Sequence, residues 1–319
     1  MISLEQVTKV YESRRLFGKR APHKAVDSLS LEIPAGIFGL LGVNGAGKST
    51  TLKMIATLLH PTSGRILIEG KDSVKDEKPL RRRINMITGS DRMLYFRLTG
   101  RENLSYFAAL YGLGYRETKR RVDFLLDLTG LSAAAGQRVE QYSRGMKQRL
   151  SIARGLINDP SVLLLDEPTL GLDVEMAHEI RRFIKNELAA ARKGTIILTS
   201  HYMQEIEAVC PRLGILQHGK LIFQGRPEEL YERMGLRTRH LFSYPADEEL
   251  PAELSDLIGG AATEVAVRGG QREFLVPGDR AYALLGGMER LQAFGLGYRQ
   301  EEPGLEEAIL KLSKETAPC

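Results

Sequence analysis

The chain has 319 residues, of which 43% are hydrophobic and 27% charged. This composition is typical of a globular protein of about two domains and argues against a disordered chain. No apolar run approaches the ~18 residues of a membrane span, and the start MISLEQVTKVY lacks a signal-peptide core, so a soluble protein is expected. The net charge of +5 is uneven, because residues 241–319 carry 7 Lys and Arg against 14 Asp and Glu. The basic remainder would suit nucleic acid, anionic lipid or nucleotide phosphates, and charge alone does not choose among them.

Residues 2–10 and 29–33 alternate apolar and polar side chains, which predicts two strands joined by a basic, turn-rich connection. Tyr11 ends the first strand. Its ring could stack on a nucleotide base, but the spacing alone indicates an ordinary strand-end tyrosine.

A phosphate-binding loop follows, because the apolar run 36–41, the glycine-rich segment GVNGAGKST and a helical pattern over 52–59 come in that order. Glycines let backbone N–H groups turn inward, a lysine can reach the β- and γ-phosphates, and a serine hydroxyl can hold Mg²⁺. A chance match in a glycine-rich loop is the alternative, and the strand and helix context disfavours it. The predicted nucleotide-binding residues are Gly42, Asn44, Gly45, Ala46, Gly47, Lys48, Ser49 and Thr50.

Residues 65–69 and 84–88 predict two further strands, with a charged helical turn at 76–83 between them. From 99 to 157 the period becomes helical, which predicts an inserted helical subdomain over about 90–158. Thr99 with Glu102 predicts a capping box. Two apolar faces are expected, one made by Leu104, Phe107, Ala108 and Tyr111, the other by Val122, Leu125, Leu126 and Leu128.

The last helix of this subdomain begins after Ser143, a natural N-cap, and its buried stripe is predicted to be Leu150, Ala153, Leu156 and Ile157. The Ser143 hydroxyl and the Gly145 N–H could form a second anion site. An ordinary helix cap is the simpler interpretation of this segment by itself.

The apolar run 162–165 predicts a buried parallel strand that ends in Asp166 and Glu167, where α/β sheets bind ligands. Asp166 could hold Mg²⁺, and Glu167 could deprotonate an attacking water. Two solvated loop acids are the alternative. Asp173 opens a helix predicted over 174–191. His201 follows the next apolar strand, 195–199, and could bind a γ-phosphate oxygen. Residues 213–217 and 220–224 predict a hairpin.

These motifs resemble those of the ATP-binding-cassette (ABC) ATPases over roughly residues 1–232. The glycine loop is similar to Walker A, VLLLDEP to Walker B with its catalytic glutamate, and YSRGMKQ to the signature. His201 is similar to the switch histidine, Leu172-Asp173 to the D-loop, and Tyr11 to the adenine-stacking aromatic. The resemblance implies a head-to-tail pair of cassettes, in which ATP lies between Walker A of one chain and Ser143 and Gly145 of the other.

Two positions depart from the family pattern. The usual signature LSGGQ is YSRGM here, with Arg144 and Met146 in place of a glycine and the glutamine. The position of the Q-loop glutamine falls on Ser90, which is shorter, and Asp91 could substitute for it as a metal ligand. The resulting hypothesis is that coupling depends less on this metal contact.

Residues 236–319 are expected to form a separate C-terminal accessory domain. Strands are predicted at 239–244, 262–268, 272–276 and 296–301, and helices at 251–258, 279–293 and 304–315. The order βαββαβ suggests a ferredoxin-like unit. This domain also resembles the extension of daunorubicin-resistance-like exporter ATPases. The predicted fold is therefore an α/β P-loop cassette over 1–235, with a RecA-like core and an antiparallel β subdomain, followed by this α+β domain.

The resemblance implies the ATPase subunit of a membrane transporter, most consistent with an exporter, that uses ATP and Mg²⁺. Its partners would be a membrane permease and a second cassette, with a homodimer favoured and a heterodimer open. It would lie at the cytoplasmic face of the cell membrane. A soluble cassette acting on ribosomes or DNA is the alternative from another class, although no nucleic acid is expected. A cassette that binds ATP but hydrolyses it poorly is a further alternative.

Overall fold

The computed structural model describes residues 1–12, 22–89, 94–191, 194–245, 247, 263–268, 271–276, 281 and 297–315. Contacts divide the chain into two compact units, Met1–Pro227 and Glu228–Ala317. The boundary we expected, between residues 235 and 236, lies beyond helix α8 (Pro227–Arg233), most of which belongs to the second unit. Among the helices of the described ranges, none combines the length and the apolar character needed to cross a bilayer.

The first unit is built on a six-stranded sheet with the order β10-β9-β3-β8-β7-β6. Its strands are β3 (Gly36–Leu41), β6 (Ile84–Thr88), β7 (Val162–Asp166), β8 (Thr195–Ser200), β9 (Arg212–Gln217) and β10 (Lys220–Gly225). All neighbours pair in parallel except β10, which forms the predicted antiparallel hairpin with β9. The central strands are buried along their length, as continuous apolar runs in a parallel sheet require.

A smaller antiparallel sheet has the order β2-β1-β4-β5. Its strands are β1 (Ile2–Tyr11), β2 (His23–Ile33), β4 (Ser63–Ile68) and β5 (Lys71–Asp72). Strand β2 begins earlier than its apolar pattern predicts because His23 pairs with Tyr11 of β1. This pairing brings the two ends of the basic connection together beside the glycine loop.

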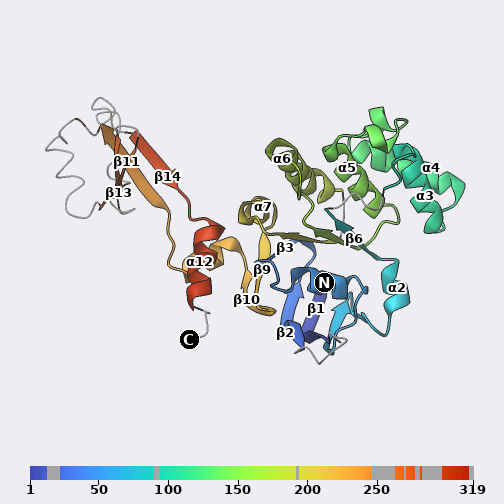
Figure 1. Cartoon of the computed structure of the whole chain (residues 1–319), viewed down its shortest axis with the longest axis horizontal. Coiled ribbons are helices and arrows are strands. Elements are labelled where there is room, and N and C mark those ends of the chain that lie inside the picture. Colours follow the sequence, from blue (N-terminus) through green and yellow to red (C-terminus); the bar gives the residue numbers. More distant parts are fainter. Residues whose placement is uncertain are drawn as a thin grey trace, which may run out of the picture. The chain divides into compact units, whose positions relative to one another are not determined.

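Helices cover both faces of the six-stranded sheet (Figure 1). Helix α1 (Lys48–Ile55) and the small sheet lie on one face, and α6 (Val174–Arg182) and α7 (Met203–Val209) lie on the other. Helix α1 begins four residues before the predicted 52–59, because its first turn belongs to the glycine loop and carries no apolar pattern. The predicted helix 174–191 changes to a π-helical segment, η4 (Phe183–Leu188), after Arg182.

The inserted helical subdomain gathers beside the edge strand β6 (Figure 1). Its elements are α3 (Gly100–Leu110), α4 (Tyr115–Leu128), η2 (Ser132–Ala134), η3 (Val139–Gln141) and α5 (Arg144–Gly155), while the short α2 (Glu77–Arg81) precedes β6. The Thr99–Glu102 capping box and the buried stripe of α5 are confirmed. Of the apolar face predicted for α3, Leu104 and Ala108 are buried, whereas Tyr111 follows the last residue of the helix, is 42% exposed, and donates its hydroxyl to Asn85 of β6.

The second unit contains an antiparallel sheet with the order β12-β13-β11-β14. Its elements are β11 (Arg239–Pro245), β12 (Thr263–Arg268), β13 (Gln271–Val276), β14 (Gly297–Glu301) and helix α12 (Leu305–Glu315). The helix predicted over 251–258, and that over 279–293 apart from Ala281, lie outside the described residues. The strand order is consistent with a βαββαβ unit, and the ferredoxin-like assignment stays a prediction.

Candidate nucleotide site

The glycine loop lies between the end of strand β3 and the start of helix α1. Gly45 and Gly47 have φ angles of +84° and +103°, in the left-handed region that favours glycine. A Cβ atom at Gly47 would lie 2.6 Å from the carbonyl oxygen of Ala25, so a larger residue would displace the backbone of β2. The loop is therefore shaped to present backbone N–H groups at a helix N-terminus, where anions bind.

A cavity of about 210 Å³ opens beside this loop. Its lining brings together most of the predicted site: Tyr11, His23, Ala25, Asn44, Gly45, Gly47, Lys48, Ser49, Thr50 and Glu167. Two predicted residues do not line the cavity: Ala46 is buried, and the Gly42 carbonyl oxygen accepts a hydrogen bond from Lys48. His23, on β2, was not predicted, because it enters the site only through the pairing of β1 with β2.

Lys48 is a buried cation, with 6% of its surface exposed. Its Nζ atom donates to the carbonyl oxygens of Gly42 and Val43, at 2.5 and 3.3 Å. Burial lowers the pKa of Lys48, and the charges of Glu167 and Asp166 offset part of that effect. A desolvated ammonium that donates to carbonyl oxygens is well suited to pair with a phosphate.

Asp166, at the end of β7, faces the hydroxyl groups of two other elements. Its Oδ1 atom accepts from Thr199 Oγ1 at 2.6 Å and from Ser49 Oγ at 3.4 Å. Carboxylate and hydroxyl oxygens are hard ligands that fit Mg²⁺, which keeps several waters and uses substrate phosphates for the rest of its shell. The described residues hold no group of three His, Cys, Asp or Glu that could bind a metal.

Glu167 and His201 are brought together from β7 and the end of β8, with His201 Nδ1 at 3.2 Å from Glu167 Oε1. Glu167 has φ = +51°, an uncommon conformation for a residue with a side chain. Its backbone N–H donates to the Thr199 carbonyl oxygen at 3.1 Å, and these contacts hold the strained residue in place. The carboxylate therefore faces both the cavity and an imidazole.

Ser143, Gly145 and Asp173 line a separate cavity of about 360 Å³, which contains no residue of the glycine loop. Ser143 Oγ accepts from the Met146 N–H at 3.2 Å, and Asp173 Oδ1 accepts from the Met176 N–H at 2.9 Å, so each caps its own helix. Arg144 Nη1 donates to the Gly171 carbonyl oxygen at 3.1 Å. Within one chain, the signature and the D-loop thus lie together and away from Walker A.

Thr199 is a site residue that the sequence analysis missed, because it was taken only as part of an apolar strand. Its position opposite Asp166 follows from the parallel register of β7 and β8. The sequence signal that could have identified Thr199 is its hydroxyl group, which lies at the end of a predicted strand and two residues before His201. Ser90 and Asp91 lie outside the described residues.

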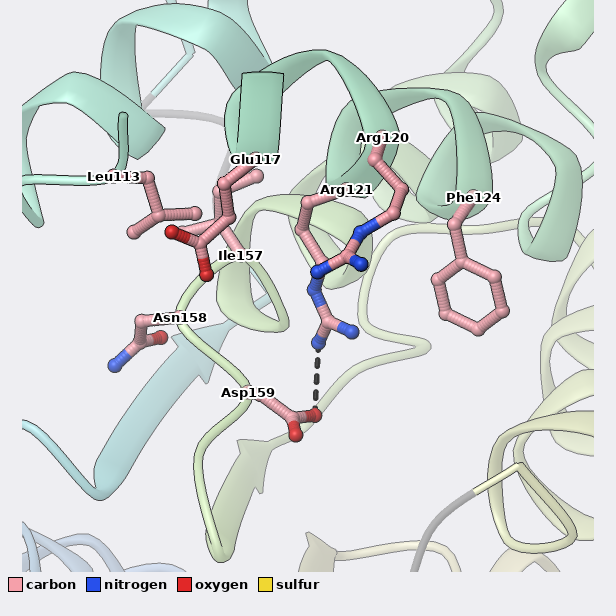
Figure 2. A pocket seen from close by; sticks show the side chains of 8 residues that line it. All are labelled: Leu113, Glu117, Arg120, Arg121, Phe124, Ile157, Asn158 and Asp159. Atoms are coloured by element: carbon pink, nitrogen blue, oxygen red, sulfur yellow. Dashed lines mark hydrogen bonds and ion pairs between the residues drawn. The ribbon is translucent and has the colours of Figure 1, made fainter. Parts of the chain in front are cut away.

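A larger cavity, of about 480 Å³, lies in the helical subdomain, and none of the predicted nucleotide-site residues lines it. Figure 2 shows Arg121 of α4 pointing across it to Asp159, with Nη2 at 2.9 Å from Oδ1. Arg121 also donates to the Leu156 carbonyl oxygen at 2.6 Å. This arginine is thus occupied in joining α4 to the chain after α5.

The fold and the first cavity define a P-loop nucleotide-hydrolase cassette. Residues 26–170 match the family described as ABC transporter. The chain is 43% identical over 221 residues to the ABC transporter ATP-binding protein NatA of Bacillus subtilis (strain 168), covering 69% of this chain and 89% of that protein. It is 37% identical over 290 residues to Nod factor export ATP-binding protein I of Sinorhizobium fredii (strain NBRC 101917 / NGR234), and the match covers 90% of this chain and 81% of that protein.

A third relative is the daunorubicin/doxorubicin resistance ATP-binding protein DrrA of Streptomyces peucetius, 35% identical over 78% of this chain and 74% of that protein. Among solved structures, an ATP-binding cassette described as a dimeric post-hydrolysis state with ADP and Pi superposes with a TM-score of 0.61. It is 25% identical and covers 71% of this chain and 98% of its own. The chain belongs to the ATP-binding subunits of ABC transporters, which bind and hydrolyse ATP.

Proposed function

We propose that two copies of this cassette close around MgATP and that hydrolysis drives a separate membrane permease. The observation that carries the proposal is the division of site residues between two cavities. Lys48 and Glu167 line one, whereas Ser143, Gly145 and Asp173 line the other. A site that needs both sets is complete only when a second cassette supplies the missing half. The two identical halves of a homodimer would make two such sites, and a heterodimer with a related cassette would serve equally.

The residues of the first cavity have separate roles in this proposal. The N–H groups of the glycine loop (residues 42–50) and Lys48 bind the β- and γ-phosphates, and the exposed ring of Tyr11 stacks on adenine. Ser49 and Asp166 would hold Mg²⁺, which neutralises charge on the phosphate oxygens. Glu167 orients an attacking water and accepts its proton, and His201 holds Glu167 and donates toward the γ-phosphate.

The second cavity acts on the ATP of the partner. The Ser143 hydroxyl and the N-terminal N–H groups of α5 would face its γ-phosphate, where the helix dipole favours negative charge. Asp173 caps α6 at the same edge and would help to align the two chains. Arg144 adds a positive charge beside this cavity, and its Nη1 donates to the carbonyl oxygen of Gly171, the residue before the D-loop.

The permease would dock on the helical subdomain. Helix α3 exposes Tyr106 and Leu110 one turn apart, and Tyr111 and Tyr115 continue the apolar surface. Beside them lies a groove of about 340 Å³ that reaches β6 and is lined by Leu58, Asn85, Met86, Thr88, Phe107, Tyr111, Arg154 and Gly155. Exposed aromatic side chains beside a groove are typical of protein interfaces.

Export is the direction that the relatives favour, since the printed names include Nod factor export and daunorubicin/doxorubicin resistance. The chain would then lie at the cytoplasmic face of the cell membrane, attached through the permease. Nothing in the proposal requires nucleic acid.

Complementation between two inactive variants tests the composite site. Lys48→Ala removes one half and Ser143→Ala the other, so each purified variant should have little ATP turnover. Mixed in equal amounts, they should recover up to about a quarter of wild-type turnover, because half of the pairs contain one intact site of two. A mixture no more active than its components would contradict the composite site. Lys48→Ala mixed with Glu167→Gln is the control, because both changes fall in the same half.

A further inference from the structure

We infer that Glu205, on helix α7, is a positioning residue for ATP hydrolysis. The inference rests on the roles proposed above for Glu167 and His201. Glu205 lies outside every motif identified in the sequence, and it is buried, with 7% of its surface exposed. A buried carboxylate is costly unless several donors satisfy it, so the identity of those donors indicates what it holds.

Three side chains from three segments donate to this carboxylate. Thr169 Oγ1 lies 2.8 Å from both carboxylate oxygens, Ser200 Oγ lies 2.6 Å from Oε2, and Arg181 Nη1 lies 2.9 Å from Oε1. Ser200 Oγ in turn accepts from the Tyr202 N–H at 3.0 Å. The hydrogen bonds therefore run in one direction, from the backbone beside His201 into the carboxylate.

Two of the three donors come from the segments that carry Glu167 and His201, and the third comes from the helix that follows the D-loop. Thr169 follows Glu167 by two residues, and its carbonyl oxygen accepts from the Leu172 N–H, which begins the turn into the D-loop. Ser200 precedes His201 directly. Arg181 lies on α6, the helix that Asp173 caps.

Glu205 therefore fixes the spacing between the two strand ends whose side chains meet as the Glu167–His201 pair. That pair has one direct contact, at 3.2 Å, and Glu167 is held in an uncommon backbone conformation. Releasing Thr169 and Ser200 would let the carboxylate and the imidazole move relative to the γ-phosphate. The glycine loop makes none of these contacts, so nucleotide binding should not depend on Glu205.

The test measures kcat and KM for ATP, with the folded fraction of each variant determined by thermal melting. Glu205→Ala should lower kcat about 10- to 100-fold per folded molecule with KM changed by less than about threefold, since small misplacements of reacting groups cost rate. Glu205→Gln keeps the shape and an acceptor, and should recover kcat to within about fivefold of wild type. Glu207→Ala, at an exposed acid on the same helix, is the matched control and should leave both constants unchanged.

If Glu205→Ala does not fold, Thr169→Val and Ser200→Ala each remove one of the three side-chain donors to the carboxylate and should lower kcat about 3- to 10-fold. Unchanged kcat per folded molecule, a loss confined to KM, or a Glu205→Gln variant no better than Glu205→Ala would each overturn the inference. Glu167→Gln in the same assay separates the two claims. Wild-type turnover in that variant would remove the proposed role of Glu167 and this inference with it, whereas full turnover in the Glu205 variants alone would remove only the inference.

Discussion

At the scale of single residues, the first cavity places a buried cation beside two carboxylates. Lys48 supplies positive charge where phosphates would bind, and Glu167 supplies a base on the other wall. Removing the charge of Lys48 should therefore affect ATP binding, whereas removing the charge of Glu167 should affect hydrolysis.

Glu167→Gln should lower ATP turnover about 10²- to 10⁴-fold, because the amide cannot accept a proton from water. ATP affinity should stay within about threefold of wild type, since Lys48 and the glycine loop are untouched. Phosphate release and binding of a fluorescent ATP analogue measure the two effects. Glu187→Gln, at an exposed glutamate of η4, should leave both unchanged. Turnover near wild type in Glu167→Gln would contradict the role of Glu167 as the base.

Lys48→Met should remove ATP binding without destabilising the ligand-free protein. Burial lowers the pKa of Lys48 below its ordinary value of 10.5, so the folded state resists protonation and the charged lysine costs stability near neutral pH. This loss of folding stability is fully present at pH values below the pKa of Lys48 in the folded protein, and it disappears as the pH rises toward 10.5.

Thermal melting of both proteins against pH measures this effect. The melting temperature of Lys48→Met should equal or exceed that of wild type near neutral pH, and any advantage should shrink in alkaline buffer. ATP should raise the melting temperature of wild type only. A variant that is less stable near neutral pH, with a deficit that shrinks in alkali, would show that the hydrogen bonds of Lys48 outweigh its desolvation.

At the scale of elements, two helices of the same subdomain offer a matched pair of N-caps. Thr99 caps α3 and Ser143 caps α5, each accepting from a backbone N–H of its first turn. Only Ser143 lines the cavity that is proposed to face a partner's ATP. Comparing variants at the two positions therefore distinguishes an effect on helix stability from an effect on catalysis.

Ser143→Ala and Thr99→Ala should each destabilise the protein by about 1 kcal/mol, the usual value of an N-cap hydrogen bond. Only Ser143→Ala should also lower ATP turnover, by about tenfold or more, because it loses a hydroxyl contact to the γ-phosphate. Urea unfolding and phosphate release give the two quantities. Equal turnover in both variants would leave Ser143 with a capping role alone.

At the scale of the whole molecule, the proposed function requires a surface that joins the cassette to a membrane protein. Helix α3 presents Leu110, with 65% of its surface exposed, beside the groove at β6. Val74, in the turn after β5, is also apolar and 43% exposed but is not among the residues that line that groove.

Leu110→Glu should abolish co-purification of a polytopic membrane protein from detergent extracts, because a charge would be buried at the docking surface. Its ATP turnover without the permease should stay within about twofold of wild type, since no residue of either nucleotide cavity changes. Val74→Glu is the control and should retain the membrane protein. Capture of ribosomes or DNA by the wild type, with no membrane protein, would contradict the transporter role.

Local patterns in the sequence determined most of the helices, strands and loops that carry the site. The glycine loop, the strand ending in Asp166 and Glu167, and the cap at Ser143 are each encoded by neighbouring residues, because turn geometry, periodicity and capping act over a few positions. For that reason the elements of the cassette and most of the lining of the first cavity could be predicted. The start of α1 at Lys48 could not, since its first turn serves the phosphate loop and has no apolar face.

Only the tertiary structure decided which of these elements meet. Thr199 reaches Asp166 through the register of β7 and β8, and Glu205 collects donors from three segments. The separation of Ser143 from Lys48 into different cavities is likewise a property of the folded chain. These contacts join residues far apart in the sequence, and their geometry depends on strand order and helix packing, which local patterns do not encode.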